Sequence, residues 1–408
     1  MKLLYNLGIY VYGFLIFLAS LFTSKARKRW IGQRQAFALL NEKIKEEPES
    51  KYIWFHAASL GEFEQGRPVM EAVKDTYPQY KILLTFFSPS GYEVRKSYKG
   101  VDLVCYLPLD TSSNAEKFIN LVKPTKAIFI KYEFWPNFIS SCRRYKIPAY
   151  VISANFRKEQ LFFKWYGKKY ADILKSFEYL FVQDENSRNL LGEIGVSKVK
   201  VAGDTRFDRV VEIASAKKNL PIVDAFKNGQ KMIIAGSSWP KDEDLLIRYL
   251  VENSKLKLLL APHEIDESHI QEIESKLNTE VVRYSKATVD NVRSASCLII
   301  DNFGLLSSVY QYADISYIGG GFGVGIHNTL EAAVYGKPVV FGPNYKRFRE
   351  ACDLISYGGA FSIEDYEQLK VRFDWLLLDE SAGNRAYEYV SNNVGATKRI
   401  VDTIFAQG

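Results

Sequence analysis

The chain has 408 residues, of which 47% are hydrophobic and 25% are charged, and its formal net charge is +7. This composition excludes extended disorder, and the length favours two domains over a single compact core. The four cysteines and four histidines are dispersed without CxxC or HExxH spacing, which argues against a disulfide framework and predicts no metal site. The positive charge fits an anionic partner, but charge alone does not identify it.

The N-terminus carries the one membrane signal in the sequence. Residues 3–22 contain no charged side chain, and a basic cluster follows at 25–29. The apolar run is long enough to enter a bilayer, and the cations behind it would keep the rest of the chain on the cytoplasmic side. A cleaved signal peptide is disfavoured because only Lys2 precedes the run. The sequence leaves open whether the segment spans the bilayer, lies in its interface or packs on the protein's own core.

Beyond the basic cluster, short apolar strands alternate with helical patterns in two successive series, which is typical of parallel sheets covered on both faces. The expected strands are 52–56, 80–86, 101–107, 127–130, 149–153 and 179–183 in the first series, and 232–235, 256–260, 298–300, 315–318 and 339–341 in the second. A charged stretch at 203–223 is the predicted hinge between them. Residues 366–379 and 388–405 are expected to form two closing helices.

This pattern predicts four parts. They are a membrane-anchor helix at 1–24, an N-terminal Rossmann-like acceptor-binding domain at 25–215, a C-terminal Rossmann-like nucleotide-sugar-binding domain at 216–385, and a C-terminal helix at 386–408 that could cross back to the N-terminal domain. Ligands of doubly wound sheets bind at the carboxyl ends of the strands. Function is therefore sought in the loops that follow the strands.

Two such loops in the first series carry glutamates. The loop HAASLGE at 56–62 is not a GxGxxG motif, so a dinucleotide fold is disfavoured. Glu62 at its end is either a carboxylate that complements a helix start or a base that takes the proton from an acceptor hydroxyl. Glu133 is a second candidate site carboxylate, whereas its neighbours Phe134 and Trp135 are expected to be packing residues.

The second series offers groups suited to a phosphate. Gly236, Ser237 and Ser238 provide backbone N–H groups and two hydroxyls at an expected helix start. The following acidic run at 242–244 resembles a metal-binding DxD motif, but acidic residues are common in the first turn of a helix and we assign it no metal role. His263 either contacts a phosphate or caps local backbone, and the sequence does not decide between the two.

The run GGGFGVGIHNTLE at 319–331 is the clearest nucleotide signal. Its glycines allow close approach of the backbone, and an expected helix start after them would favour a phosphate. Glu331 is placed to accept hydrogen bonds from ribose hydroxyls, as acidic residues do in other nucleotide folds.

Together these motifs resemble the 3-deoxy-D-manno-octulosonic acid (Kdo) transferases of lipopolysaccharide synthesis. The shared motifs are the N-terminal apolar segment, HAASLGE at 56–62, EFWPN at 133–137, GDTRFD at 203–208, GSS at 236–238, the glycine-rich run at 320–331 and FGP at 341–343. The match extends through most of the chain.

The resemblance implies a GT-B fold, in which two Rossmann-like α/β domains face one another across a cleft. It implies a monotopic enzyme on the cytoplasmic face of the inner membrane that transfers Kdo from CMP-Kdo to a lipid A precursor, with inversion, release of CMP and neither metal nor cofactor. Glu62 becomes the general base, while Glu133 and Arg157 lie near the acceptor. The donor-binding residues are Arg206, Gly236, Ser237, Ser238, His263, Gly320, Gly321, Asn328 and Glu331.

The sequence departs from the family pattern at Ala261-Pro-His-Glu264, where an arginine is missing and His263 is the candidate replacement. One alternative is a GT-B transferase or epimerase that uses a UDP-sugar, since such enzymes share the glycine-rich loop and the ribose-binding glutamate. Another is a membrane-bound nucleotide-sugar binding protein without catalysis. Nucleic acid is the least favoured partner, because the positive charge is not concentrated among repeated aromatic residues.

Overall fold

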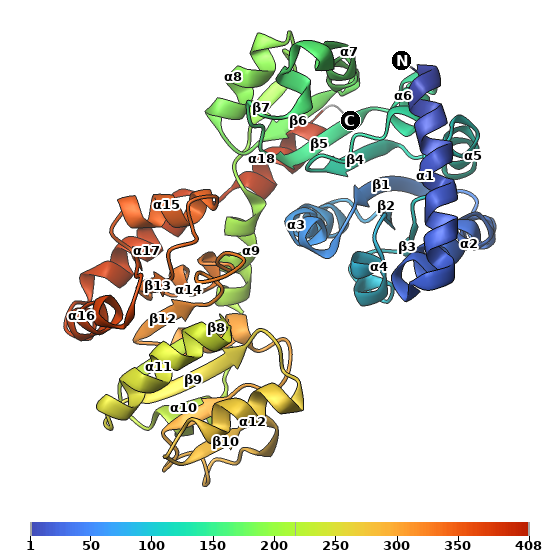
Figure 1. Ribbon diagram of the computed structural model, residues 1–408. Coiled ribbons are helices and arrows are strands. Elements are labelled where there is room, and N and C mark those ends of the chain that lie inside the picture. The colour runs from blue at the N-terminus through green and yellow to red at the C-terminus, as the bar shows by residue number, and fades with distance from the viewer. Residues whose placement is uncertain (1, 217, 407–408) are drawn as a thin grey trace. The chain divides into compact units, whose positions relative to one another are not determined.

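The computed structural model describes residues 2–216 and 218–406, and the chain divides into two compact units (Figure 1). Unit 1 comprises Met1–Asp208 and Val394–Gly408, and unit 2 comprises Arg209–Asn393. Each unit contains one seven-stranded sheet in which every strand pair is parallel. This is the two-domain α/β architecture of the GT-B class expected from the sequence.

The sheet of unit 1 has the strand order β3-β2-β1-β4-β5-β6-β7. Its central strands are apolar runs buried on both faces, as parallel sheets covered by helices require. The strands are β1 (Lys51–Ala57), β2 (Tyr80–Phe86), β3 (Leu103–Tyr106), β4 (Lys126–Ile130), β5 (Ala149–Ala154), β6 (Tyr179–Val182) and β7 (Val199–Val201). The order reverses between β1 and β4, so the loops that follow these two strands lie at the switch point where such sheets bind ligands.

The α-helices that begin in unit 1 are α1 (Lys2–Phe22), α2 (Ser24–Glu46), α3 (Leu60–Thr76), α4 (Pro89–Arg95), α5 (Ser112–Val122), α6 (Pro136–Arg144), α7 (Lys168–Ala171), α8 (Glu185–Glu193), α9 (Thr205–Ser215) and α18 (Ala396–Phe405). Helix α9 crosses the boundary between the units. Helix α18, the last in the chain, packs on α3 within unit 1.

Unit 2 has the strand order β10-β11-β9-β8-β12-β13-β14, with its own switch point between β8 and β12. Its strands are β8 (Met232–Ser238), β9 (Lys257–Pro262), β10 (Val281–Arg283), β11 (Cys297–Ile299), β12 (Ile315–Ile318), β13 (Val339–Phe341) and β14 (Ala360–Ser362). Its α-helices are α10 (Pro221–Lys227), α11 (Pro240–Glu252), α12 (Glu267–Ser275), α13 (Leu306–Val309), α14 (Leu330–Ala333), α15 (Arg349–Ser356), α16 (Tyr366–Leu376) and α17 (Ser381–Asn392).

The predicted strands are all present, but the structure adds β7, β10 and β14. Each of these has three residues and lies at the edge of its sheet, where it is only partly buried, so it lacks the apolar run that marks the inner strands. The boundary between the two units, at Asp208 and Arg209, falls within the predicted hinge at 203–223, although α9 and the start of α10 make much of that stretch helical. The single helix expected at 388–405 is wrong, because the helix is broken near Gly395, whose φ of 97° is left-handed.

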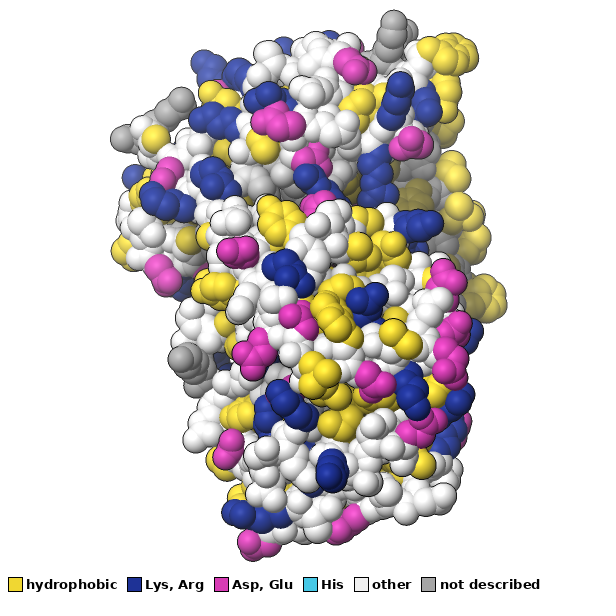
Figure 2. Space-filling model, turned by 90° about the vertical axis from the view of Figure 1, so that its left-hand side faces the viewer, with side chains coloured by type: hydrophobic (Ala, Val, Ile, Leu, Met, Phe, Trp, Pro, Cys, Tyr) yellow, Lys and Arg dark blue, Asp and Glu magenta, His cyan; other side chains and the backbone are white. Residues whose placement is uncertain are grey.

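Helix α1 packs along unit 1 on one side only. Ile9, Gly13, Ile16 and Ser20 are buried, and a Cβ on Gly13 would come within 2.6 Å of the Leu109 side chain. The opposite side leaves large apolar side chains exposed: Leu3, Leu4, Leu7, Val11, Phe14, Leu15, Leu18, Leu21 and Phe22. By length and composition, the helix could cross a membrane. By contrast, the face of the molecule shown in Figure 2 carries interspersed acidic and basic side chains.

Helix α18 is fastened by the motif at 203–208. The carboxylate of Asp208 accepts backbone N–H groups from Gly395 at 2.5 Å and Thr397 at 2.7 Å, and so caps the start of the helix. The Arg399 side chain donates back to the Ala202 carbonyl at 2.8 Å. The motif thus has a structural task in unit 1.

We predict that Asp208→Ala loosens α18 without unfolding unit 1. Loss of a capping carboxylate costs about 1–2 kcal/mol, so amides in residues 396–405 should exchange with solvent roughly tenfold faster by hydrogen–deuterium exchange. Asp402→Ala removes only an exposed pair with Lys398 and serves as the matched control. Equal exchange in the two variants would contradict the capping role.

Candidate functional site

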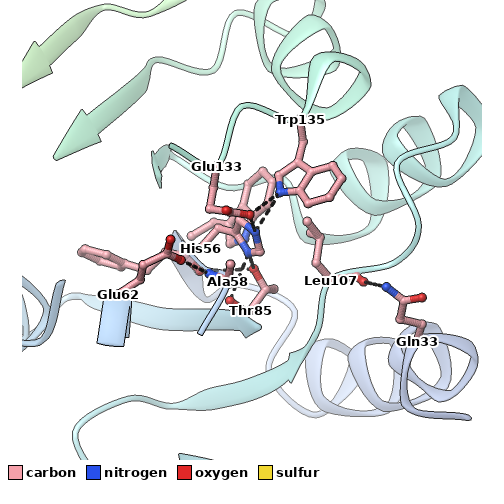
Figure 3. A network of polar contacts seen from close by, with 10 residues as sticks. Gln33, His56, Ala58, Glu62, Thr85, Leu107, Glu133 and Trp135 are labelled. Carbon is pink, nitrogen blue, oxygen red and sulfur yellow. Dashed lines mark hydrogen bonds and ion pairs between the residues drawn. The ribbon is translucent and has the colours of Figure 1, made fainter. Parts of the chain in front are cut away.

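His56, near the end of β1, and Glu133, in the loop after β4, lie together in unit 1 (Figure 3). His56 is completely buried, and its Nε2 lies 3.3 Å from Oε2 of Glu133. The indole N–H of Trp135 donates to the same carboxylate oxygen at 2.9 Å and lies 3.0 Å from the imidazole Nε2. One carboxylate therefore holds both an imidazole and an indole.

The other side of the His56 ring is fixed by Thr85 on β2. Nδ1 lies 2.9 Å from the Thr85 hydroxyl, which also accepts the indole N–H of Trp54 at 2.8 Å. Nδ1 also lies 3.1 Å from the backbone carbonyl of Thr85, so both oxygens of this threonine hold the ring, and the donor and acceptor roles of the two ring nitrogens depend on the tautomer. The imidazole acts as a rigid support for Glu133.

Glu62 lies in the first turn of α3, beside this pair (Figure 3). Its carboxylate accepts the backbone N–H of Ala58 at 2.5 Å. Burial raises the pKa of Glu62, and the negative charge of Glu133 raises it further, against the opposing effects of the Ala58 N–H, His56 and Lys131. A carboxylate whose pKa is raised by burial and a like charge is suited to accept a proton.

Left-handed backbone marks three of the strand ends. Lys131 follows β4 with φ 62°, Ser153 lies near the end of β5 with φ 57°, and Ser237 lies near the end of β8 with φ 53°. Such conformations in residues other than glycine cost about 1–3 kcal/mol and gather at functional sites. Their position at the carboxyl edges of both sheets supports the choice of these loops.

Arg157 and Arg206 are the remaining candidates in unit 1. Arg157 is exposed in the loop after β5, and its positive charge acts on the Tyr132 hydroxyl. Arg206 donates through Nε and Nη2 to Asp204 at 2.9 and 2.7 Å. It belongs to unit 1, whereas the other predicted donor residues belong to unit 2.

In unit 2, the buried carboxylate of Asp242 joins two of the predicted loops. It accepts the backbone N–H of Trp239 at 3.0 Å, the backbone N–H of Gly320 at 2.9 Å and the hydroxyl of Tyr317 at 2.7 Å. Asp242 therefore organises the phosphate-type loop after β8 and the glycine-rich loop after β12. These protein partners fit the structural role that the sequence suggested for the acidic run.

The glycines allow neighbouring loops to touch through their backbones. A Cβ on Gly321 would lie 2.6 Å from the backbone nitrogen of Gly342, and Gly319 donates its N–H to Gly236 at 2.9 Å. Gly320 has a φ of 91°. Any side chain at Gly321 would push the glycine-rich loop away from the loop after β13.

Three rings stack beside these glycines. The His263 imidazole lies 4.8 Å from the Trp239 ring and 4.7 Å from the His327 ring, measured between centroids. Burial lowers the pKa of His327, and the nearby His263 lowers it further. His263, the middle ring of the three, is exposed and therefore accessible to a ligand.

The other candidate donor-binding residues differ in how far their side chains are buried or already hydrogen-bonded. The Ser238 hydroxyl is buried and donates to Glu243 at 2.9 Å, whereas Ser237 is only half-buried. Asn328 donates its side-chain amide to Glu331 at 3.0 Å, so these two residues form one polar unit. Helix α14 has only four residues, too few to contribute much of a dipole, so the loop itself would provide the donors.

Among residues 2–216 and 218–406, no group of three or more histidine, cysteine or acidic side chains is arranged to hold a metal ion.

The sequence model of the family described as 3-deoxy-D-manno-octulosonic-acid transferase (kdotransferase) matches residues 30–209. The transferase of this name from Rickettsia bellii is 26% identical over 357 residues, covering 85% of this chain and 84% of that protein. The one from Aquifex aeolicus is 27% identical over 332 residues, covering 80% and 86%. The chain is therefore similar to Kdo transferases over most of its length.

The chain also has the fold of solved GT-B-like proteins. The UDP-GlcNAc 2-epimerase from Neisseria meningitidis bound to UDP-GlcNAc superposes with a TM-score of 0.60 over 87% of this chain and 100% of that protein. At 16% identity, that likeness concerns the fold alone. The similarity to Kdo transferases makes the chain a glycosyltransferase.

The structure adds residues that the sequence did not single out. His56 was seen only as part of a loop, yet it supports Glu133. Trp135 was expected to pack, as Phe134 does within an aromatic cluster, but its indole N–H serves the site carboxylate. Asp110 accepts backbone N–H groups at the start of α6, but the sequence does not predict this role, because a lone aspartate after a strand has no local signature. The sequence signal near His56 is the small-residue loop that begins where β1 ends.

We predict that Glu133→Gln lowers the pKa of the Glu62 carboxyl, because the substitution removes a neighbouring negative charge while keeping an oxygen that can accept from Trp135. The side-chain carboxyl carbon of Glu62, assigned with Glu62→Gln, would be titrated by NMR in both proteins. Glu64→Gln is the control, since Glu64 lies on the same helix as Glu62 but pairs with Arg95 of α4. An unchanged or raised pKa would show that Glu133 does not act on Glu62.

Proposed function

We propose that this glycosyltransferase moves Kdo from CMP-Kdo to a lipid A precursor, with inversion at the anomeric carbon and release of CMP. The observation that carries the proposal is the carboxylate of Glu62, whose pKa is raised by burial and by Glu133 inside the region matched by the Kdo transferase family model. The names of the relatives support Kdo as the transferred sugar.

In the proposed reaction, Glu62 accepts the proton of the acceptor hydroxyl as the hydroxyl oxygen forms a bond to the anomeric carbon of Kdo. The bond between that carbon and the phosphate oxygen breaks, and the electron pair leaves with CMP. Attack opposite the leaving group inverts the anomeric configuration. Glu133, held by His56 and Trp135, keeps Glu62 basic, and Arg157 is proposed to meet a phosphate of the acceptor.

We assign the donor to unit 2. Its proposed ligands there are Gly236, Ser237, Ser238, His263, Gly320, Gly321, Asn328 and Glu331, with Arg206 of unit 1 as a further cation. Asn328 and Glu331 form a hydrogen-bonded pair suited to a ribose, and the exposed His263 is suited to the phosphate. Ser238 is buried, so it would contribute its backbone groups to the donor site, while its hydroxyl holds Glu243 in position.

The decisive experiment mixes the protein with CMP-Kdo and a tetraacyl lipid A precursor and measures both CMP release and product mass. Glu62→Gln should lower turnover by about 10²- to 10⁴-fold, since general-base catalysis contributes that much, while CMP binding survives in a thermal-shift titration. Glu64→Gln should keep normal turnover. A folded wild-type protein that forms no product, or that is stabilised by UDP and not by CMP, would refute the assigned donor.

We further propose that the transferase acts at the cytoplasmic face of the inner membrane, with α1 lying in the lipid interface. The exposed apolar side of α1 supports contact with lipid. Its opposite side is packed against unit 1, which favours a helix that lies along the surface of the bilayer over one that crosses it. The basic residues at the start of α2 would then face anionic headgroups.

We predict that the double substitution Leu7→Gln and Phe14→Gln reduces binding to vesicles of anionic phospholipid. Both side chains are more than half exposed, and each loses roughly 1.5–3 kcal/mol of transfer free energy, so partitioning should fall at least about tenfold in a sedimentation assay. Leu378→Gln, which alters an even more exposed leucine of unit 2, is the control. Equal partitioning of the two variants would exclude α1 as the lipid contact.

A further inference from the structure

The buried side of α1 is joined to the site by polar side chains near its start. The Tyr5 hydroxyl donates to Oδ2 of Asp110 at 2.7 Å. The side-chain amide of Asn137 donates to Oδ1 of Asn6 at 2.8 Å. Asn137 lies in the first turn of α6, directly after the loop that carries Glu133 and Trp135. An apolar helix that served only as a lipid anchor would not need these contacts.

Asp110 makes the Tyr5 contact relevant to the loop. Its side chain is buried and accepts the backbone N–H groups of Asn137 at 3.1 Å and Phe138 at 2.9 Å. This carboxylate therefore caps α6, and the Tyr5 hydroxyl is its partner from α1. Burial raises the pKa of Asp110 to about 6, which shows how far the carboxylate is withdrawn from water. Removing the hydroxyl would leave that carboxylate short of a donor.

A second connection runs from Tyr12, two turns further along α1. The Arg29 side chain donates to the Tyr12 hydroxyl at 2.7 Å and lies over the ring of Phe87, with its guanidinium carbon 3.5 Å from the ring centroid. Phe87 in turn lies 4.5 Å from the ring of Trp135, measured between centroids. Nε and Nη2 of Arg29 are buried without a hydrogen-bond partner among the described residues. Tyr12 is therefore important for orienting this guanidinium.

Both connections end at Trp135. The first fixes the start of α6 one residue after it, and the second packs Phe87 against its ring. The Trp135 indole N–H donates to Glu133 and lies against His56, as Figure 3 shows. A displacement of α1 would thus reach the carboxylate that acts on Glu62 through two independent sets of contacts.

We propose that Tyr5 and Tyr12 of α1 are positioning residues for the transfer reaction, so that the membrane helix is also part of the scaffold of the active site. The proposal rests on the function proposed above. It assigns α1 a task that persists when no bilayer is present, because the contacts lie on its protein side. The exposed side of the helix remains free for lipid.

The kinetic test uses the full-length protein in detergent micelles, where acceptor and enzyme share a micelle and docking to a bilayer is not required. Tyr5→Phe and Tyr12→Phe each remove one hydroxyl and keep the ring. Each should lower kcat by about five- to fiftyfold, since small displacements of reacting groups reduce rates that strongly. The KM for CMP-Kdo and binding to vesicles should not change, because neither substitution alters unit 2 or the apolar side of α1.

Tyr145→Phe is the matched control. Its hydroxyl donates to a carboxylate, Glu116, at 3.3 Å, but at the opposite end of α6 and on the surface. This variant should keep the wild-type kcat. Merely structural damage would lower the melting temperature and the yield of all three variants together, whereas a positioning effect separates kcat from KM in Tyr5→Phe and Tyr12→Phe alone.

A second readout does not depend on activity. The protein has six tryptophans, and the indole N–H resonance of Trp135 can be assigned in a ¹⁵N spectrum with Trp135→Phe. Tyr5→Phe and Tyr12→Phe should shift this resonance, and Tyr145→Phe should not. A shifted indole in a protein without Kdo transfer would overturn the proposed function and leave the coupling intact. An unmoved indole together with an unchanged kcat would show that α1 only anchors the protein.

Discussion

The carboxylate of Glu133 is the constraint on which the candidate site of unit 1 depends. A carboxylate so close to a second one would ordinarily be solvated or would turn away. Here the Trp135 indole and the buried His56 hold it, and Thr85 fixes the imidazole from behind. The resulting negative charge has one main consequence, which is that it adds to burial in raising the pKa of Glu62. The proposed base therefore owes its chemistry to residues on three other segments.

In unit 2, the carboxylate of Asp242 holds the loops of the candidate site in place. Its loops are rich in glycine and serine, and such backbone has many conformations unless something fixes it. Asp242 binds the backbone of the loop after β8 and that of the loop after β12 with one side chain. The contact between Gly321 and Gly342 then adds the loop after β13. In unit 2 a buried carboxylate thus arranges the loops at the carboxyl edge of the sheet, whereas in unit 1 the partly buried Glu133 is itself held in place by two side chains.

Helix α1 combines two surfaces with different physical roles. Its outer side is apolar and exposed, as contact with lipid requires, while its inner side carries hydroxyl and amide groups that bond to protein. The hydroxyls of Tyr5 and Tyr12 both bond to protein side chains, although the Tyr12 side chain is 37% exposed and tyrosines of an apolar helix usually contact headgroups. This division makes it reasonable that membrane attachment and the geometry of the site depend on one element.

The sequence by itself determined the two parallel sheets, because long apolar runs alternate with amphipathic helices and the signal for each is local. It also identified the loops with Glu62, Glu133 and the glycine-rich run, since small residues and carboxylates after strands have a recognisable pattern. It did not reveal β7, β10 and β14, the helical nature of 203–215 or the break at Gly395, where short length or a single backbone angle decides.

Only the tertiary structure showed which distant side chains meet. His56 and Glu133 are 77 positions apart, and Tyr5 and Asp110 are 105 apart, so no spacing along the chain predicts either contact. The shifted pKa of Glu62 depends on burial and on the charge of another loop, which are properties of the folded chain. The sequence could name the residues of the site, but packing decided which of them are reactive and which hold others in place.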